Sequence, residues 1–179
     1  FESFIARYPR HQLSKEARLW RALSFFAERD YATALEALKL LGTKVKGGRL
    51  EPEVAYRIAS TYYAMRDYEL ALSSINGYLN SYPQHTRTDE ARVLLGDIEM
   101  GRGELATARA IFMEISPNAG HLFVYSAFQA GKILRAVAGA AENKMARERL
   151  LSSHIEHFQN YLNREDVPFK GRISEALYW

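Results

Sequence analysis

Apolar side chains recur along this chain at intervals of three and four residues. Leu19, Ala22, Leu23 and Phe26 show the spacing first. It returns at 34–41, 54–62, 70–79, 93–98 and 108–115. Because an α-helix turns once in about 3.6 residues, this spacing puts the apolar side chains on one helical face. No stretch alternates apolar and polar residues for long enough to indicate a strand. We therefore predict an all-α protein.

Residues that break or start helices fall between the apolar stretches. The breakers are Gly47-Gly48, Pro52, Pro83, Gly101-x-Gly103, Pro117-Asn118 and Pro168. They leave room for paired helices of about 12 to 18 residues joined by short turns. Ser14 and Thr88, each followed by acidic residues, are the expected N-caps of two of these helices.

Two repeated stretches of sequence indicate that the predicted helices recur at a fixed interval. The stretch 8–17 returns 74 residues later at 82–91, with Tyr, Pro, His and Glu-Ala in the same places. Asp30-Tyr31 returns as Asp67-Tyr68 after half that interval, 37 residues. Small residues keep the same step, at Ala22, Ala59 and Gly96 and at Ala34, Ala71 and Ala108. A fixed period between about 20 and 50 residues is typical of stacked repeats. Small residues let the packed helices approach closely.

The period divides the chain, 1–179, into a single array of repeats. The provisional repeats span 14–45, 51–82, 88–116 and 120–165. Residues 1–9 have the pattern of the end of a preceding repeat, and 168–179 that of the start of a further one. The stretch 175–179 resembles 16–20 in its Glu-Ala and in its final Trp. We therefore expect a segment of a longer protein, with exposed ends that permit end-to-end self-association.

The residues that repeat are those that define the tetratricopeptide repeat. The second repeat has most of them: Ile58-Ala59, Tyr62, Asp67-Tyr68, Ala71, Ile75 and Pro83. The first shares Ala22, Phe25, Asp30-Tyr31 and Ala34. The chain thus resembles the tetratricopeptide-repeat family. This resemblance implies a right-handed α-α superhelix of antiparallel helix hairpins, which binds protein or peptide partners in a concave groove.

A longer string points to a subset of these proteins. Phe1-x-x-Phe4-Ile5-x-x-Tyr8-Pro9 returns as Ile75-x-x-Tyr78-Leu79-x-x-Tyr82-Pro83, and Glu-Ala follows each copy. The string resembles repeats of bacterial envelope proteins of two types, the Tol-Pal coordinator and the lipoprotein of the outer-membrane barrel-assembly machinery. The resemblance implies the bacterial periplasm or cell envelope. Cytoplasmic repeat proteins carry such strings too, so the cytoplasm remains an alternative.

Composition narrows the function classes. Cysteine is absent, which excludes disulfides and thiol catalysis. Lysine and arginine number 24 and the acidic residues 21, for a net charge of +3. The densest basic stretch, 44–49, has the pattern of a loop. This near-balance argues against a nucleic-acid partner, which usually requires a basic stripe. No apolar run is long enough to span a bilayer, so we expect no membrane insertion by this segment.

The expected partner groove is lined by the first helix of each repeat. The candidates beside the buried positions are Leu19, Leu23, Phe26, Tyr56, Ser60, Tyr63, Val93, Asp97, Met100, Phe128, Lys132 and Arg135. For the leucines, Phe26 and Val93, burial between repeats is the favoured interpretation. The predicted groove is therefore Tyr56, Ser60, Tyr63, Asp97, Met100, Phe128, Lys132 and Arg135. A clamp for a C-terminal carboxylate needs Lys and Asn at the groove positions of the first helices, and those positions here hold Leu19, Leu23, Tyr56 and Ser60.

No motif supports catalysis, a metal or a cofactor. His154-x-x-His157 offers two imidazoles but no further ligands for zinc. Gly101-x-Gly103 follows no strand and lacks the Lys-Ser/Thr of a phosphate loop, and Glu165-Asp166 sits at an expected helix end. His11 and His85 share one repeat position, which favours a structural role at a helix end. We therefore predict a protein-binding scaffold and no enzyme; the alternative is an assembly arm of a larger multidomain protein.

Overall fold

The computed structural model describes residues 1–141 and 143–163, and every regular element in these ranges is helical. In chain order the elements are α1 (Glu2–Arg7), α2 (Ser14–Ala27), α3 (Tyr31–Val45), α4 (Glu51–Ala64), α5 (Tyr68–Ser81), α6 (Thr88–Arg102), α7 (Leu105–Met113), the 3-10 turn η1 (Pro117–Ala119), α8 (His121–Ala140) and α9 (Lys144–Asn163). The predicted all-α fold class is confirmed. The expected further repeat at 168–179 and the pair Glu165-Asp166 lie outside the described residues.

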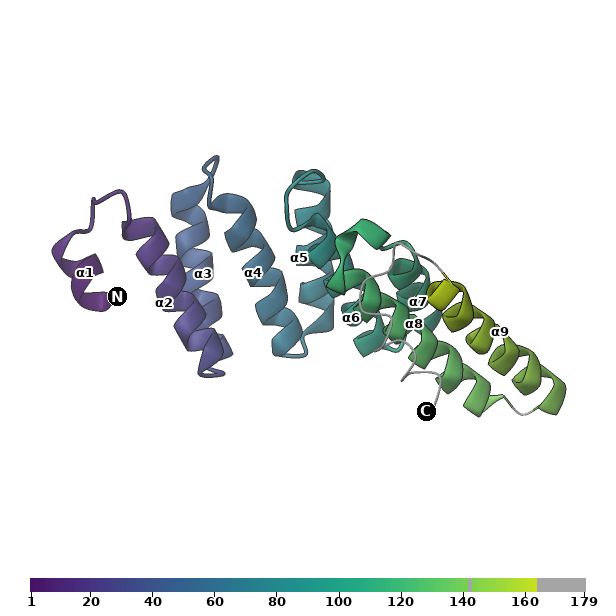
Figure 1. Ribbon diagram of the computed structural model, residues 1–179. Coiled ribbons are helices and arrows are strands. Elements are labelled where there is room, and N and C mark those ends of the chain that lie inside the picture. The colour runs from purple at the N-terminus through teal and green to yellow at the C-terminus, as the bar shows by residue number, and fades with distance from the viewer. Residues whose placement is uncertain (142, 164–179) are drawn as a thin grey trace. The chain divides into compact units, whose positions relative to one another are not determined.

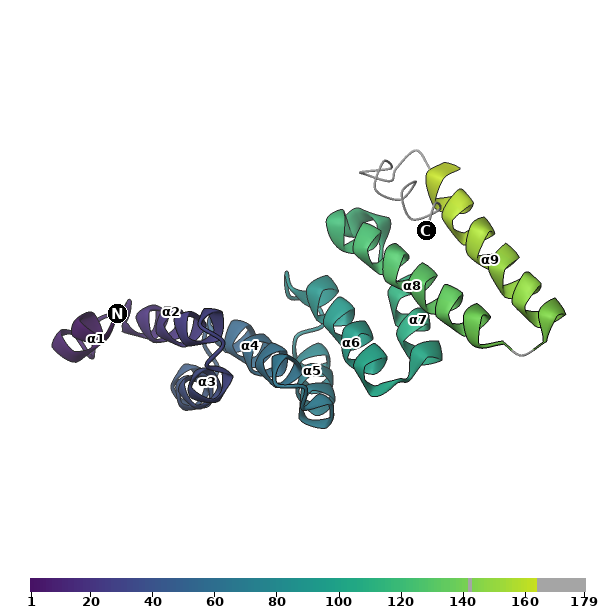
Figure 2. The ribbon, with the colours of Figure 1, turned by 90° about the horizontal axis from the view of Figure 1, so that it is seen from below.

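The chain forms two compact units, residues 1–91 and residues 92–179. In the first, called unit 1, α2 packs against α3, α3 against α4 and α4 against α5 (Figure 1). Seen from below, α2 and α4 follow one another in one row, with α3 to one side (Figure 2). In the second, called unit 2, α8 packs against both α7 and α9. Each unit is therefore a stack of helix hairpins in chain order, as a helical-repeat protein requires.

The two Asp-Tyr echoes mark the tight turns inside the hairpins of unit 1. Asp30 and Asp67 are the N-caps of α3 and α5, and each carboxylate accepts a hydrogen bond of 3.2 Å from a first-turn N–H, of Thr33 and Leu70. This satisfies a backbone donor that the helix leaves unpaired. The residue before each Asp, Arg29 or Arg66, has a positive φ, 64° or 61°, which reverses the chain direction.

The expectation that Ser14 caps α2 is wrong. The N-cap is Leu13, and the Ser14 hydroxyl donates to the carbonyl of Tyr8 in the preceding turn. Thr88 likewise donates to the carbonyl of His85, at 2.7 Å. Each hydroxyl lies on the first residue of its helix. It donates to a carbonyl of the preceding loop, and so links that loop to the helix, instead of accepting a hydrogen bond from a helical N–H.

The recurrent histidines also hold these loops. His11 Nδ1 accepts from the N–H of Leu13 at 3.1 Å, and His85 Nδ1 accepts from the N–H of Arg87 at 3.3 Å. Each bonded N–H lies just before a helix, α2 or α6. The predicted structural role at a helix end is confirmed.

Each unit has its own apolar core. In unit 1 the core cluster is Leu19, Ala22, Leu38, Leu41, Val45 and Val54. In unit 2 it is Val93, Ala108, Phe112, Ile115, Phe123, Ala130 and Ile133. The alanines at the 37-residue step, Ala22, Ala34, Ala59, Ala71 and Ala108, are all 0% exposed. Over the described residues, no helix combines the length and apolar character that crossing a bilayer requires.

Helix lengths depart from expectation in unit 2. α7 has only 9 residues and α8 has 20, against the expected length of about 12 to 18. Pro117 disfavours helical backbone at the residue before it, and Ser116 is extended, with ψ 141°, so α7 has no room to continue beyond Ile115.

Gly96 tests the close packing of α6 on α7. A Cβ at Gly96 would lie 2.6 Å from the buried ring of Phe112, whereas one at Gly77 in α5 would meet nothing within 4 Å. We expect Gly96→Ala to lower the free energy of unfolding by about 1–3 kcal/mol, because the ring has no room to move. Gly77→Ala should raise it by about 0.5–1 kcal/mol through helix propensity. Urea denaturation followed by circular dichroism measures both, and equal effects of the two variants would contradict the packing.

Candidate functional site

The polar contacts of unit 1 concentrate between the start of α4 and the loop before α6. Pro52 opens α4, where its missing N–H costs nothing, and Glu51 and Glu53 lie in the first turn. Negative charge is favourable at that end of the helix dipole. Arg87 lies one residue before α6. Glu53 and Arg87 both belong to unit 1, and they meet because α5, which precedes the loop of Arg87, packs on α4.

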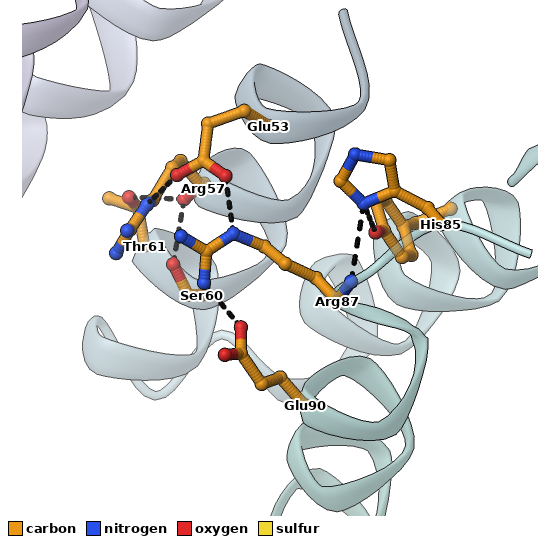
Figure 3. A network of polar contacts seen from close by, with 8 residues as sticks. Glu53, Arg57, Ser60, Thr61, His85, Arg87 and Glu90 are labelled. Atoms are coloured by element: carbon orange, nitrogen blue, oxygen red, sulfur yellow. Dashed lines mark hydrogen bonds and ion pairs between the residues drawn. The ribbon is translucent and has the colours of Figure 1, made fainter. Parts of the chain in front are cut away.

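Glu53 is the centre of an ion-pair network (Figure 3). Arg57 Nε donates to Glu53 Oε1 at 2.8 Å, and Arg87 Nε donates to Glu53 Oε2. Arg87 also pairs with Glu90. The Glu53 side chain is 19% exposed and those of both arginines are 29% exposed. Burial alone raises the pKa of Glu53, but the hydrogen bonds and charges of Arg57 and Arg87 outweigh it and lower that pKa. Partly buried and charge-assisted, these contacts are stronger than ordinary surface ion pairs.

Tyr56 lies beneath this network. The guanidinium carbon of Arg87 is 5.4 Å from the Tyr56 ring centroid and that of Arg57 is 5.8 Å. The same ring meets Tyr78 edge to face at 5.9 Å, and the Tyr78 hydroxyl is 2.8 Å from His85 Nδ1. Burial raises the pKa of Tyr56, and it raises the pKa of Tyr78 to about 12. Both phenols therefore stay neutral and support the arginines by cation–π and packing contacts.

An open groove of about 630 Å³ runs along this part of unit 1. It is lined by Glu16, Leu19, Trp20, Leu23, Arg49, Leu50, Glu53, Arg57, His85, Thr86, Arg87 and Glu90. Trp20 is 58% exposed, a large fraction for an indole. Arg49 Nη2 donates to Glu16 Oε1 at 2.8 Å. The groove therefore combines an exposed aromatic side chain and apolar neighbours with paired charges of both signs.

Glutamates line this groove at a fixed interval that the sequence analysis missed. Glu16, Glu53 and Glu90 follow one another at the 37-residue step. Each pairs with an arginine, and Arg49 and Arg87 come from the loops before α4 and α6. The recurrence of Glu-Ala was visible in the sequence only at the first and third of these positions, because Glu53 is followed by Val54. The arginines recur less regularly, so only the fold reveals the pairs.

The sequence candidates in unit 1 occupy different surroundings. Leu19 and Leu23 line the groove, with Leu19 only 6% exposed. The Ser60 hydroxyl donates to the carbonyl of Arg57. Two candidates pack their rings on the neighbouring helix, Phe26 on Tyr31 at 5.2 Å and Tyr63 on Tyr68 at 6.1 Å. In α4 it is Glu53 and Arg57, rather than the predicted Tyr56, Ser60 and Tyr63, that line this groove.

The candidates in unit 2 gather on α6 and α8. Val93 is buried in the core cluster, and Met100 packs against it half-buried. Asp97 accepts a hydrogen bond of 2.8 Å from the Tyr125 hydroxyl, and burial raises its pKa.

Three candidates share one face of α8. Lys132 Nζ is 5.7 Å from the ring centroid of Phe128, which is 41% exposed. Arg135, a turn further, is exposed. These residues present a cationic and aromatic surface of their own, and contact with a partner stays a prediction for the whole set.

The described residues contain no group of three or more His, Asp or Glu placed to hold a metal ion. The side chains of His154 and His157 lie outside the described part of α9.

The lowered pKa of Glu53 gives the network a pH signature. A carboxylate whose pKa is lower in the folded state stabilises the fold above its unfolded pKa, 4.5, and loses this contribution as pH falls through the folded value. We expect Glu53→Gln to lower the free energy of unfolding by about 1–2 kcal/mol at pH 7, and the difference to vanish in acid. Glu36→Gln, at an exposed residue of α3, is the control. Urea denaturation of both variants at pH values from 7 down into acid tests this expectation. A stability difference between wild type and Glu53→Gln that does not change with pH would contradict its origin in the ion pairs.

Comparison with known proteins assigns the fold to a family. The model of the outer membrane lipoprotein family YfiO matches residues 22–118, more than half of the 179-residue chain. The match includes Glu53, Arg57, Arg87 and Glu90 and begins after Trp20. A search of curated proteins finds no match. The predicted resemblance to bacterial envelope repeat proteins is thereby confirmed at the level of the family. This chain belongs to the YfiO family of outer membrane lipoproteins, helical-repeat proteins of the bacterial cell envelope.

Proposed function

We propose that this protein is a non-enzymatic scaffold that holds a protein partner in the groove of unit 1, as part of an outer-membrane complex. The observation that carries the proposal is Trp20, 58% exposed at the groove beside Leu19 and Leu23. Tryptophan dominates binding energy where partner residues cover it, because it buries a large area with few rotatable bonds. An indole left in water at a hollow of this size is poised for such a contact.

The charges around Trp20 define the partner that fits. Arg49–Glu16 lies beside the indole, and the Glu53–Arg57–Arg87–Glu90 network follows. A partner segment with one apolar side chain flanked by charges of both signs can cover Trp20 with that side chain. Its charges can then form ion pairs with the charged residues of the groove. Because the groove charges are already paired, a partner of a single sign gains little. Tyr56 acts here by supporting Arg87, and Ser60 by bonding within α4.

The family match also refines the envelope assignment. Of the two envelope types that the sequence resembles, the barrel-assembly type is a lipoprotein, and the matched family is described as an outer membrane lipoprotein. We therefore favour this type, with the partner met at the periplasmic face of the outer membrane. The α8 surface of Phe128, Lys132 and Arg135 is a second predicted contact for the same role. Tyr63, Asp97 and Met100 remain predicted contact residues from the sequence.

The groove proposal is tested at Trp20. Replacing Trp179 by Phe leaves Trp20 as the only tryptophan of the chain, so its fluorescence reports on the groove. A photo-crosslinking residue placed at position 20 in cells identifies the partner, and position 40, an exposed leucine of α3 (56%) outside the groove, is the control. With that partner purified, we expect a blue shift of Trp20 emission on binding. Trp20→Ala should weaken binding about tenfold or more, and Leu40→Ala less than about twofold.

Two outcomes would contradict this assignment. Equal crosslinking at positions 20 and 40 would show that the groove is not selective. Binding that survives Trp20→Ala but is lost in Phe128→Ala would place the partner on α8 instead. Thermal melts of each variant separate loss of binding from loss of fold, since an exposed tryptophan or leucine contributes little to stability.

A further inference from the structure

A second hollow of unit 1 lies beside the loop that joins α1 to α2, and its lining is strongly basic. Its volume is about 450 Å³. It is lined by Pro9, Arg10, His11, Gln12, Ser14, Lys15, Arg18 and Lys44. Four of these residues are cationic and none is acidic. Lys44 comes from the last turn of α3, so two helices and a loop contribute the charge.

These cations are not neutralised by the protein. Within the part of the chain that the structure describes, none of Arg10, Lys15, Arg18 and Lys44 pairs with a carboxylate. Glu16, which is next to Lys15 in sequence, is turned to the groove and bound by Arg49. Four like charges around one hollow repel each other, and a bound anion would relieve that repulsion.

The positive surface extends past the hollow. Arg18 and Lys44 also line a neighbouring depression together with Arg21. The nearest carboxylate to Arg21 is that of Glu2, at 3.9 Å and with a side chain 77% exposed. A pair so long and so exposed offsets little charge.

The backbone adds donors at the same place. α2 begins at the hollow, and its N-cap Leu13 provides no side-chain acceptor, in contrast to Asp30 and Asp67 at α3 and α5. The N–H of Ser14 is bonded to the carbonyl of His11 at 2.9 Å, so it is the next N–H groups of the first turn and the positive end of the helix dipole that favour an anion. His11, whose Nδ1 accepts from Leu13, fixes the loop that carries Arg10.

We propose that this hollow is a binding site for a phosphate group, held by Arg10, Lys15, Arg18 and Lys44. Guanidinium and ammonium groups that converge from several sides suit a tetrahedral anion with oxygens in all directions. A nucleic acid is held by cations that follow several successive phosphates, whereas these four cations surround a single hollow. The phosphate belongs either to a phospholipid headgroup or to a small soluble phosphate compound. This site does not depend on the partner groove, whose lining shares none of these four cations.

Inorganic phosphate tests the site directly on the full chain. Titration at constant ionic strength, followed by amide shifts in ¹H–¹⁵N NMR spectra, should give saturable changes confined to residues 10–18 and to the end of α3. Lys15→Gln with Lys44→Gln removes two charges at exposed residues and should weaken binding about tenfold or more. Lys39→Gln with Lys144→Gln removes two exposed charges elsewhere and should leave binding unchanged. Thermal melts confirm the fold of each variant. Non-saturable shifts, or equal weakening by both double variants, would overturn the proposal.

Vesicles identify the source of the phosphate. Co-sedimentation is compared for phosphatidylglycerol-containing vesicles and for phosphatidylcholine alone. Retention on the anionic vesicles that falls about thirtyfold in Lys15→Gln with Lys44→Gln assigns the site to a lipid headgroup. Saturable phosphate binding with vesicle retention equal in the two double variants assigns it to a soluble compound.

Discussion

The whole arrangement depends on burying helix faces that one hairpin cannot bury alone. α2 and α3 leave apolar residues that α4 covers, and α4 in turn packs on α5. Close approach requires small side chains at the contacts, so Ala22, Ala59 and the other alanines of the 37-residue step are fully buried. At Gly96 there is no room for any side chain, because the Phe112 ring occupies the space that a Cβ would fill. Stacking thus fixes the distance from one repeat to the next.

That fixed distance also creates the polar site. Arg87, in the loop that follows α5, meets Glu53 in the first turn of α4 because α5 packs on α4 within unit 1. Arg49 meets Glu16 of α2 in the same way. Burial then strengthens the contact at Glu53, whose pKa falls despite its desolvation. The ion pairs report the stacking geometry and, at the same time, supply the charged walls of the groove.

Sequence reasoning captured the periods of the apolar and small residues and missed the contacts between charged side chains. The 3.6-residue spacing predicted helices because burial of one face imposes that period on the sequence. In α4 the groove is lined by Glu53 and Arg57, each three positions before the predicted Tyr56 and Ser60, because helical spacing alone does not fix how far a helix rotates toward its neighbour. Contact of the predicted residues with a partner stays a prediction. Ser14 was misassigned as a cap because hydroxyls both donate and accept, and only the loop geometry decides which. The basic stretch 44–49 was predicted to be a loop, but Lys44 and Val45 belong to the last turn of α3. That Lys44 joins Arg10 and Lys15 at one hollow depends on contacts between segments distant in the sequence.

Helix α2 contributes residues to two surfaces, the groove around Trp20 and the basic hollow. Glu16 and Trp20, four residues apart, share the face that lines the groove, while Lys15 and Arg18, three apart, share the face that lines the basic hollow. Between them, Ala17, Leu19 and Ala22 are buried. Any rotation of α2 that improved one surface would therefore move the other and expose the core. Because the packed face holds α2 rigidly, a partner in the groove and an anion in the hollow can be bound by the same helix without a change in its position.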